Sequence, residues 1–89
     1  MISASFRREL KARAHSLKPV VIVGQRGVTD SVIASMTEAL DVHELIKIRL
    51  PAGDRGEQPA RIEHIATSLG AEVVGSIGRV VILYRKTLK

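Results

Sequence analysis

The chain has 89 residues, a formal net charge of +5 and an isoelectric point of about 10.3. It contains no cysteine, which excludes disulfide bonds and cysteine-ligated zinc and fits a reducing compartment. No apolar run approaches the length of a membrane span, and the N-terminus lacks the apolar segment of a secretory signal. We therefore expect a single cytoplasmic domain over residues 1–89, without a membrane association.

Positive charge is concentrated at both ends of the chain. Residues 1–27 carry six basic side chains and one carboxylate, and residues 73–89 carry four basic side chains and no carboxylate. Residues 28–72 carry four basic and eight acidic side chains. If the fold brings the ends together, they form one basic surface of the kind that nucleic-acid binders use. The alternative is ordinary solubilising charge.

The first predicted element is an amphipathic helix over residues 3–17, which Pro19 prevents from continuing. Four apolar residues at helical spacing predict its core side: Phe6, Leu10, Ala14 and Leu17. One position later, a cationic row repeats that spacing: Arg7, Lys11, His15 and Lys18. Arg8 lies beside this row, so the helix should present a cationic ridge next to its buried face.

Residues 20–23 predict the first strand, and the loop Gly24-Gln25-Arg26-Gly27 follows it. Thr29 is a good N-cap for a second helix that runs to about Leu40. Val28 and Ile33 have the spacing of a hydrophobic staple around that cap. Residues 41–43 are expected to form the turn out of this helix.

The second half of the chain predicts one more helix and three strands. Strand 44–50 has apolar residues on one face and Lys47 and Arg49 on the other. A loop over 51–57 leads to a helix from Pro59 to Leu69, and strands 71–77 and 80–84 are joined by a two-residue turn. The order is α-β-α-β-α-β-β, an α/β fold. The strand–helix–strand units should have parallel strands and the last pair should be antiparallel, which gives a four-stranded mixed sheet.

The glycine loop is the strongest functional signal in the sequence. At a junction between a strand and a helix, the first helical amides lack intrahelical partners, and two glycines let a phosphate or sugar approach them while Arg26 adds charge. The loop lacks the Lys-Ser/Thr of a Walker motif and the third glycine of a dinucleotide fingerprint. A GxxG loop that holds a nucleic-acid backbone matches better. The alternative is a tight turn that needs positive φ and binds nothing.

The remaining polar residues give little support for catalysis or metal binding. The three histidines lie on different elements without metal-ligand spacing, and no pair of carboxylates is placed for acid–base work. We therefore expect no enzyme activity, no metal and no cofactor. Only Phe6 and Tyr84 are aromatic, so stacking of bases on aromatic side chains cannot be extensive. Recognition of backbone and shape in structured RNA, through Arg and Lys, is the better match.

Three segments in the right order resemble the YhbY-type CRM domain: AHSLKPVVIVGQRGVTDSV at 14–32, HELIKIRL at 43–50 and GRVVILYR at 78–85. The resemblance covers roughly residues 3–86. It implies a fold similar to the C-terminal domain of translation initiation factor three, with an added N-terminal helix. Stand-alone members of that family associate with precursors of the large ribosomal subunit. The resemblance therefore implies a role in 50S assembly, with Gly24 and Gly27 as the family's loop glycines.

We thus expect a cytoplasmic monomer that contacts ribosomal RNA through the loop and a basic surface. The predicted RNA contacts are Gly24, Gln25, Arg26, Gly27, Arg7, Arg8, Lys11, Lys18, Lys47, Arg49, Arg85 and Lys86. Two other hypotheses stay open. One is a protein-docking module, which uses the acidic segment 28–72 to hold a ribosomal protein or assembly factor. The other is an enzyme acting on a phosphorylated small molecule held at the loop.

Overall fold

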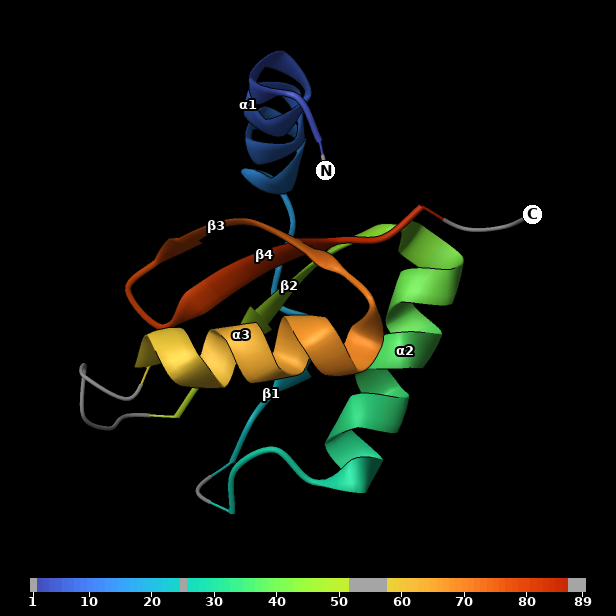
Figure 1. The fold of residues 1–89 in the computed structure, drawn as a ribbon, viewed down its shortest axis with the longest axis vertical. Coiled ribbons are helices and arrows are strands. Elements are labelled where there is room, and N and C mark those ends of the chain that lie inside the picture. Colours follow the sequence, from blue (N-terminus) through green and yellow to red (C-terminus); the bar gives the residue numbers. More distant parts are fainter. Residues whose placement is uncertain (1, 25, 52–57, 87–89) are drawn as a thin grey trace.

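The computed structural model of the chain describes residues 2–24, 26–51 and 58–86 (Figure 1). The helices are α1 (Ala4–Ala14), α2 (Asp30–His43) and α3 (Gln58–Leu69). The strands are β1 (Val21–Ile22), β2 (Leu45–Arg49), β3 (Glu72–Ile77) and β4 (Val80–Tyr84). The predicted order of elements is confirmed. Most of the loop predicted at 51–57, and the last three residues of the basic tail, lie outside the described residues.

The four strands form one mixed sheet in the order β1-β2-β4-β3. β1 and β2 are parallel, and β4 is antiparallel to both of its neighbours, β2 and β3. The predicted mixed sheet is therefore confirmed. β2 and β3 run in the same direction, but they do not pair, because β4 returns from the hairpin and takes the place between them.

Helices cover both faces of this sheet (Figure 1). α2 and α3 pack on one face, where the larger core contains Met36, Leu40, Ile65 and Leu69 together with the inward residues of β2 and β4. α1 packs on the other face, where Leu10 and Ala14 meet a smaller cluster: Leu45, Val74 and Ile82. We call these the α2/α3 face and the α1 face. The predicted alternation in β2 is confirmed, since Ile46 and Ile48 are buried on the α2/α3 face while Lys47 and Arg49 lie on the α1 face.

α1 is shorter than the sequence predicted. Ser3 is its N-cap and accepts a hydrogen bond from the Phe6 N–H at 3.1 Å. The helix ends at Ala14, where the Leu17 N–H bonds back to the Ala14 carbonyl at 3.0 Å in a turn. Leu17 is therefore 38% exposed, and its predicted place in the core is wrong.

α2 is longer than predicted, because residues 41–43 form its last turn rather than the exit from the helix. The helix ends at Glu44, whose φ of 61° turns the chain while its N–H bonds to the Leu40 carbonyl. The strand predicted at 20–23 is recorded for two residues only. The amides of Val20 and Val23 nevertheless donate to the Lys47 and Arg49 carbonyls, so the extended segment has the predicted length.

Candidate nucleic-acid interface

The glycine loop is held at both ends by apolar residues that pack on the core. Val23 is 2% exposed at the end of the first strand, and Val28 packs against the same core at the start of α2. Between them the Gly27 N–H donates to the Gly24 carbonyl at 3.0 Å, and Gly27 has a φ of +80°. Only glycine adopts that conformation without strain, so Gly27 has a conformational role. The predicted contact Gln25 lies outside the described residues.

The outer side of the loop is open. A Cβ placed on Gly24 or Gly27 would meet no heavy atom within 4 Å. Thr29 caps α2 by accepting the Val32 N–H at 3.2 Å. The amides of Asp30 and Ser31, the first two residues of the helix, have no intrahelical acceptor. Asp30 also sits in this first turn. The open space at both glycines thus permits close approach of an anionic backbone at the loop.

β2 carries two predicted cations, of which Arg49 lies beside the loop. Arg49 pairs with Ile22 in the sheet, and its carbonyl accepts the Val23 N–H at 2.8 Å, one residue before the loop begins. Lys47 lies one pleat away on the same face and donates from Nζ to the Leu17 carbonyl at 3.1 Å. Lys47 therefore also ties the segment after α1 to the sheet.

A second cationic site lies at the other end of β1. Lys18 and Lys47 line a pocket of about 370 Å³ together with Arg13 and His43. Arg13 and His43 were not predicted to bind RNA. Arg13 does not belong to the cationic row on α1, and His43 was expected in a turn. The excess of basic residues in 1–27, to which Arg13 contributes, was the sequence feature that pointed to this site.

Two predicted contacts on α1, Arg7 and Lys11, lie against β3. The Arg7 guanidinium donates to the carbonyls of Val73 and Val74, at 2.6 and 3.1 Å, at the register shift in β3. The Lys11 side chain lies over Gly75, where an added Cβ would be 2.8 Å from its Cε. The Arg7 bonds fix α1 to β3, whereas the exposed Lys11 side chain makes no hydrogen bond to another described residue. Any role of either residue in binding RNA stays a prediction.

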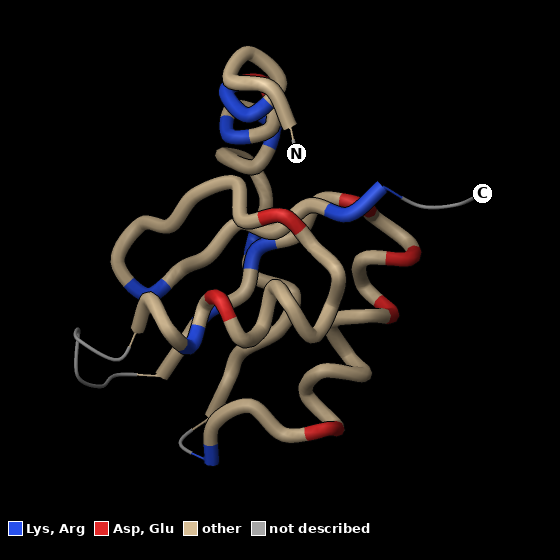
Figure 2. Tube along the Cα trace, in the orientation of Figure 1, with Lys and Arg blue, Asp and Glu red and all other residues tan. Residues whose placement is uncertain are grey.

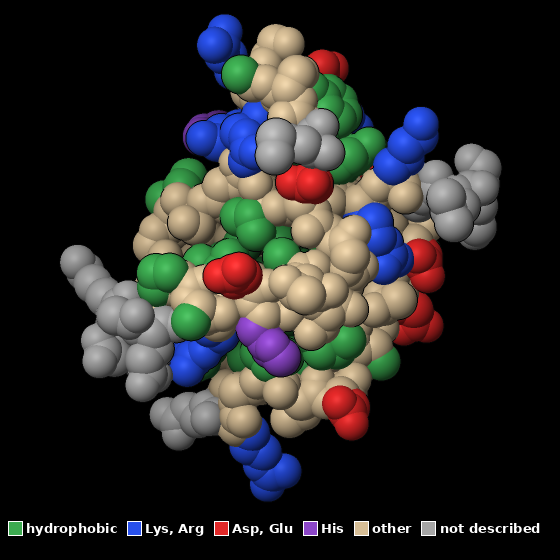
Figure 3. All heavy atoms as spheres, viewed as in Figure 1, with side chains coloured by type: hydrophobic (Ala, Val, Ile, Leu, Met, Phe, Trp, Pro, Cys, Tyr) green, Lys and Arg blue, Asp and Glu red, His purple; other side chains and the backbone are tan. Residues whose placement is uncertain are grey.

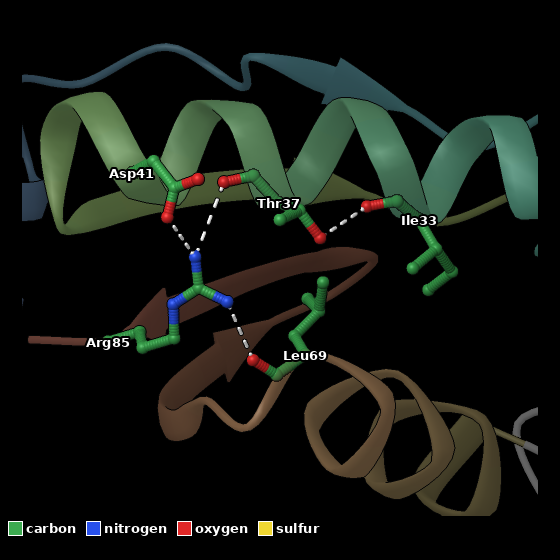
Figure 4. A network of polar contacts seen from close by, with 5 residues as sticks. All are labelled: Ile33, Thr37, Asp41, Leu69 and Arg85. Atoms are coloured by element: carbon green, nitrogen blue, oxygen red, sulfur yellow. Dashed lines mark hydrogen bonds and ion pairs between the residues drawn. The ribbon is translucent and has the colours of Figure 1, made fainter. Parts of the chain in front are cut away.

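Arg85 lies in a network between α2, α3 and β4 (Figure 4). Its guanidinium donates to the Leu69 carbonyl at 2.9 Å, to the Thr37 carbonyl at 3.4 Å and to the Asp41 carboxylate. The Arg85 N–H bonds to the Glu44 carbonyl, so this network is at the opposite end of β2 from the loop. At about 3.3 Å per residue, the length of β2 separates Arg85 from the loop by roughly 16 Å. The geometry favours a structural role, and its predicted RNA contact stays a prediction.

The other predicted cations are available to a ligand. Their side chains are exposed and make no hydrogen bond or ion pair to another residue that the structure describes: Arg8, Lys18, Arg26, Arg49 and Lys86. Arg79, which was not selected, is also exposed and lies in the turn before β4.

Cations are most frequent on α1, and carboxylates are most frequent on α2. Figure 2 shows Lys and Arg along α1 and carboxylates along α2, with further carboxylates on α3 and β3. In the space-filling view from the same side, carboxylates lie over α2 and α3, and several Lys and Arg side chains gather around α1, while others lie beside α3 and next to the carboxylates of α2 (Figure 3). The cations of α1 and the carboxylates of α2 therefore lie on different parts of the surface.

The described part of the chain offers no metal site or membrane span. No group of three or more His, Asp or Glu residues within it could hold a metal ion. None of its helices combines the length and apolarity needed to cross a bilayer.

Known proteins resemble this chain in sequence and in fold. Residues 2–85 match the family model of the CRS1/YhbY (CRM) domain. The chain is 36% identical over 83 residues to a protein of Pseudomonas aeruginosa named as a probable RNA-binding protein, covering 93% of this chain and 80% of that one. It is 38% identical over 84 residues to an RNA-binding protein of Haemophilus influenzae, covering 94% and 85%. The solution structure of a Staphylococcus aureus protein superposes with a TM-score of 0.86 at 24% identity, over 100% of this chain and 93% of that one.

Proposed function

Because the chain belongs to the CRS1/YhbY (CRM) domain family, we propose that it is an RNA-binding protein that holds an RNA backbone at the loop 24–27. The observation that carries this proposal is the open loop at the start of α2, with the free Arg26 in it and Arg49 beside it. Relatives in two bacteria are named as RNA-binding proteins, which supports the same ligand. The loop glycines permit close approach, and the two arginines neutralise phosphate charge.

We further propose that the RNA is ribosomal and that the protein acts in the cytoplasm, without catalysis, during assembly of the large ribosomal subunit. The resemblance to stand-alone YhbY-type proteins supports this target. The positive surface extends along β1 toward α1 through Lys18, Lys47 and Arg13. These side chains could contact further phosphates of an RNA helix beyond the loop. Such contacts to phosphates give affinity without reading the base sequence.

Cross-linking in cells tests this function. Ultraviolet cross-linking, purification of the protein and sequencing of the attached RNA should recover fragments of large-subunit ribosomal RNA and its precursors. A variant with Arg26→Glu and Arg49→Glu should recover several-fold less of them at equal protein level. Recovery of messenger or transfer RNA alone would contradict the ribosomal target, and equal recovery with the variant would contradict the site.

A protein-docking role is the second candidate, and the carboxylates on α2 and α3 favour it (Figure 2). This surface lies away from the N-terminal cations, so it could hold a basic ribosomal protein while the loop binds RNA. A complex that survives nuclease treatment and is lost in Glu38→Lys, Glu63→Lys would support docking, since both side chains are exposed on α2 and α3. Loss of the complex on nuclease treatment alone would leave RNA as the direct partner.

A further inference from the structure

One row of residues crosses all four strands beside the glycine loop. Ile22 of β1 pairs with Arg49 of β2, Arg49 pairs with Val80 of β4, and Val80 pairs with Ile77 of β3. Residues that pair in this way point to the same face of a sheet. We call these four residues the exposed rung, and they lie on the same face as α1.

α1 covers the other half of that face and leaves three of these four residues exposed, while Val80 is half-buried. Its contacts are with Leu45, Val74 and Ile82, which lie farther from the loop. In the rung, Ile22 is 67% exposed and Ile77 is 73% exposed, and Arg49 between them is exposed as well. Large aliphatic side chains so exposed on one row of a sheet form a surface that suits a partner.

The charge of this surface selects the partner. The next row inward contains Lys47, Ile82 and Gly75, and the Lys11 side chain lies over Gly75. Neither row contains a carboxylate, and Arg79 directly precedes Val80 in the chain. An aliphatic surface with cations on and around it complements a ligand with negative charge and flat apolar groups. An unpaired RNA strand combines these two properties.

The dimensions and the position fit the same ligand. Four neighbouring strands about 4.8 Å apart span roughly 14 Å, enough for more than one unstacked base. Gly24 follows Ile22 by two residues, so a strand whose backbone is held at the loop would continue onto the rung. The planar guanidinium of Arg49 can stack on a base, a role that Arg shares with aromatic residues in RNA recognition.

We propose that the exposed rung binds the bases of unpaired nucleotides that adjoin the backbone held at the loop. This rests on the proposed RNA binding and adds the class of RNA: a helix with a single-stranded extension or bulge. It replaces the expectation that recognition stops at backbone and shape. Base contact here depends on aliphatic side chains and one guanidinium instead of aromatic rings.

The experiment compares two RNAs that share one hairpin, of which one ends blunt and the other carries three unpaired 3′ nucleotides. Affinities are measured by fluorescence anisotropy for wild type, for Ile22→Thr, Ile77→Thr and for Val42→Thr. Val42 on α2 is 73% exposed, the same fraction as Ile77, so it is a matched control. Threonine keeps the β-branch that strands favour, and the change removes no charge.

Wild type and Val42→Thr should bind the extended RNA about tenfold more tightly than the blunt one. The double variant should lose this preference, bind the blunt hairpin within about twofold of wild type, and keep the wild-type salt dependence. Circular dichroism and urea unfolding report on its fold. If the double variant is unfolded, the single variant Ile77→Thr at the sheet edge should show part of the same loss.

Each other outcome has a distinct meaning. If the folded variants keep the full preference for the extended RNA, the rung does not contact bases and this inference is overturned, while backbone binding at the loop stands. The inference is likewise overturned if the variants lose only self-association or binding of a protein and keep their preference for the extended RNA. If wild type binds neither hairpin, the proposed RNA binding itself fails and the inference fails with it.

Discussion

Replacing Gly27 by aspartate should weaken binding to a structured RNA by at least about tenfold, and Gly24→Asp, Gly27→Asp should weaken it by about a hundredfold. The added side chains would project into the open space beside the loop, where no protein atom lies within 4 Å of a Cβ. They would exclude a phosphate from that space and repel it electrostatically. Fluorescence anisotropy at constant salt measures the loss.

Gly70→Asp is the matched control for Gly27→Asp. Gly70 has a φ of +63°, a Cβ on it would also meet nothing within 4 Å, and it lies after α3, far along the chain from the loop. The two variants carry the same change of charge and a similar backbone strain of about 1 kcal/mol. Gly70→Asp should bind RNA within about twofold of wild type. Equal affinities of the two variants would show that the loop has no part in binding.

Arg85→Met should lower the free energy of unfolding by about 2 kcal/mol. The substitution keeps an apolar side chain of similar length but removes the donors to the Leu69 and Thr37 carbonyls and to Asp41. The Arg85 side chain is 23% exposed, so water can reach part of the network and replace some of the lost hydrogen bonds, which limits the loss of stability. Because the network joins α2, α3 and β4, its loss should reduce the stability of the whole sheet and of both helices. Urea unfolding followed by circular dichroism measures the change.

Lys86→Met controls for the loss of one positive charge in the same tail. Lys86 is exposed and bonds to no other described residue, so its replacement should change stability by less than about 0.5 kcal/mol. RNA affinity of folded Arg85→Met should stay within about twofold of wild type. Unchanged stability together with a large loss of RNA affinity would instead make Arg85 an RNA contact, as the sequence analysis predicted.

The elements could be predicted from the sequence because local chemistry decides them. Thr29 caps α2 as its side chain and position indicated, and alternation in β2 separates Ile46 and Ile48 from Lys47 and Arg49. Gly78 adopts a φ of +59° in the turn between β3 and β4, as the hairpin required. Each of these features depends on residues a few positions apart in the chain.

The features that the sequence did not reveal depend on distant residues. Leu17 has the spacing of a core residue, but α1 ends three residues before it, so the side chain does not continue the buried row of the helix. The place of β4 between β2 and β3 is set by pairing across the whole domain. Arg85 looked like part of a basic tail because its acceptors on α2 and α3 are 16 to 48 residues away. The exposed rung exists only once all four strands pair.

An NMR titration tests the central claim most directly. The ¹⁵N-labelled protein is titrated with the hairpin that carries unpaired nucleotides, and changes in amide shift are mapped onto the fold. RNA held at the loop should shift the amides of Gly24, Arg26, Gly27 and Arg49 and leave those of Glu38 and Asp41 on α2 unchanged. Shifts confined to α2 and α3, with the loop amides unchanged at saturation, would contradict the account.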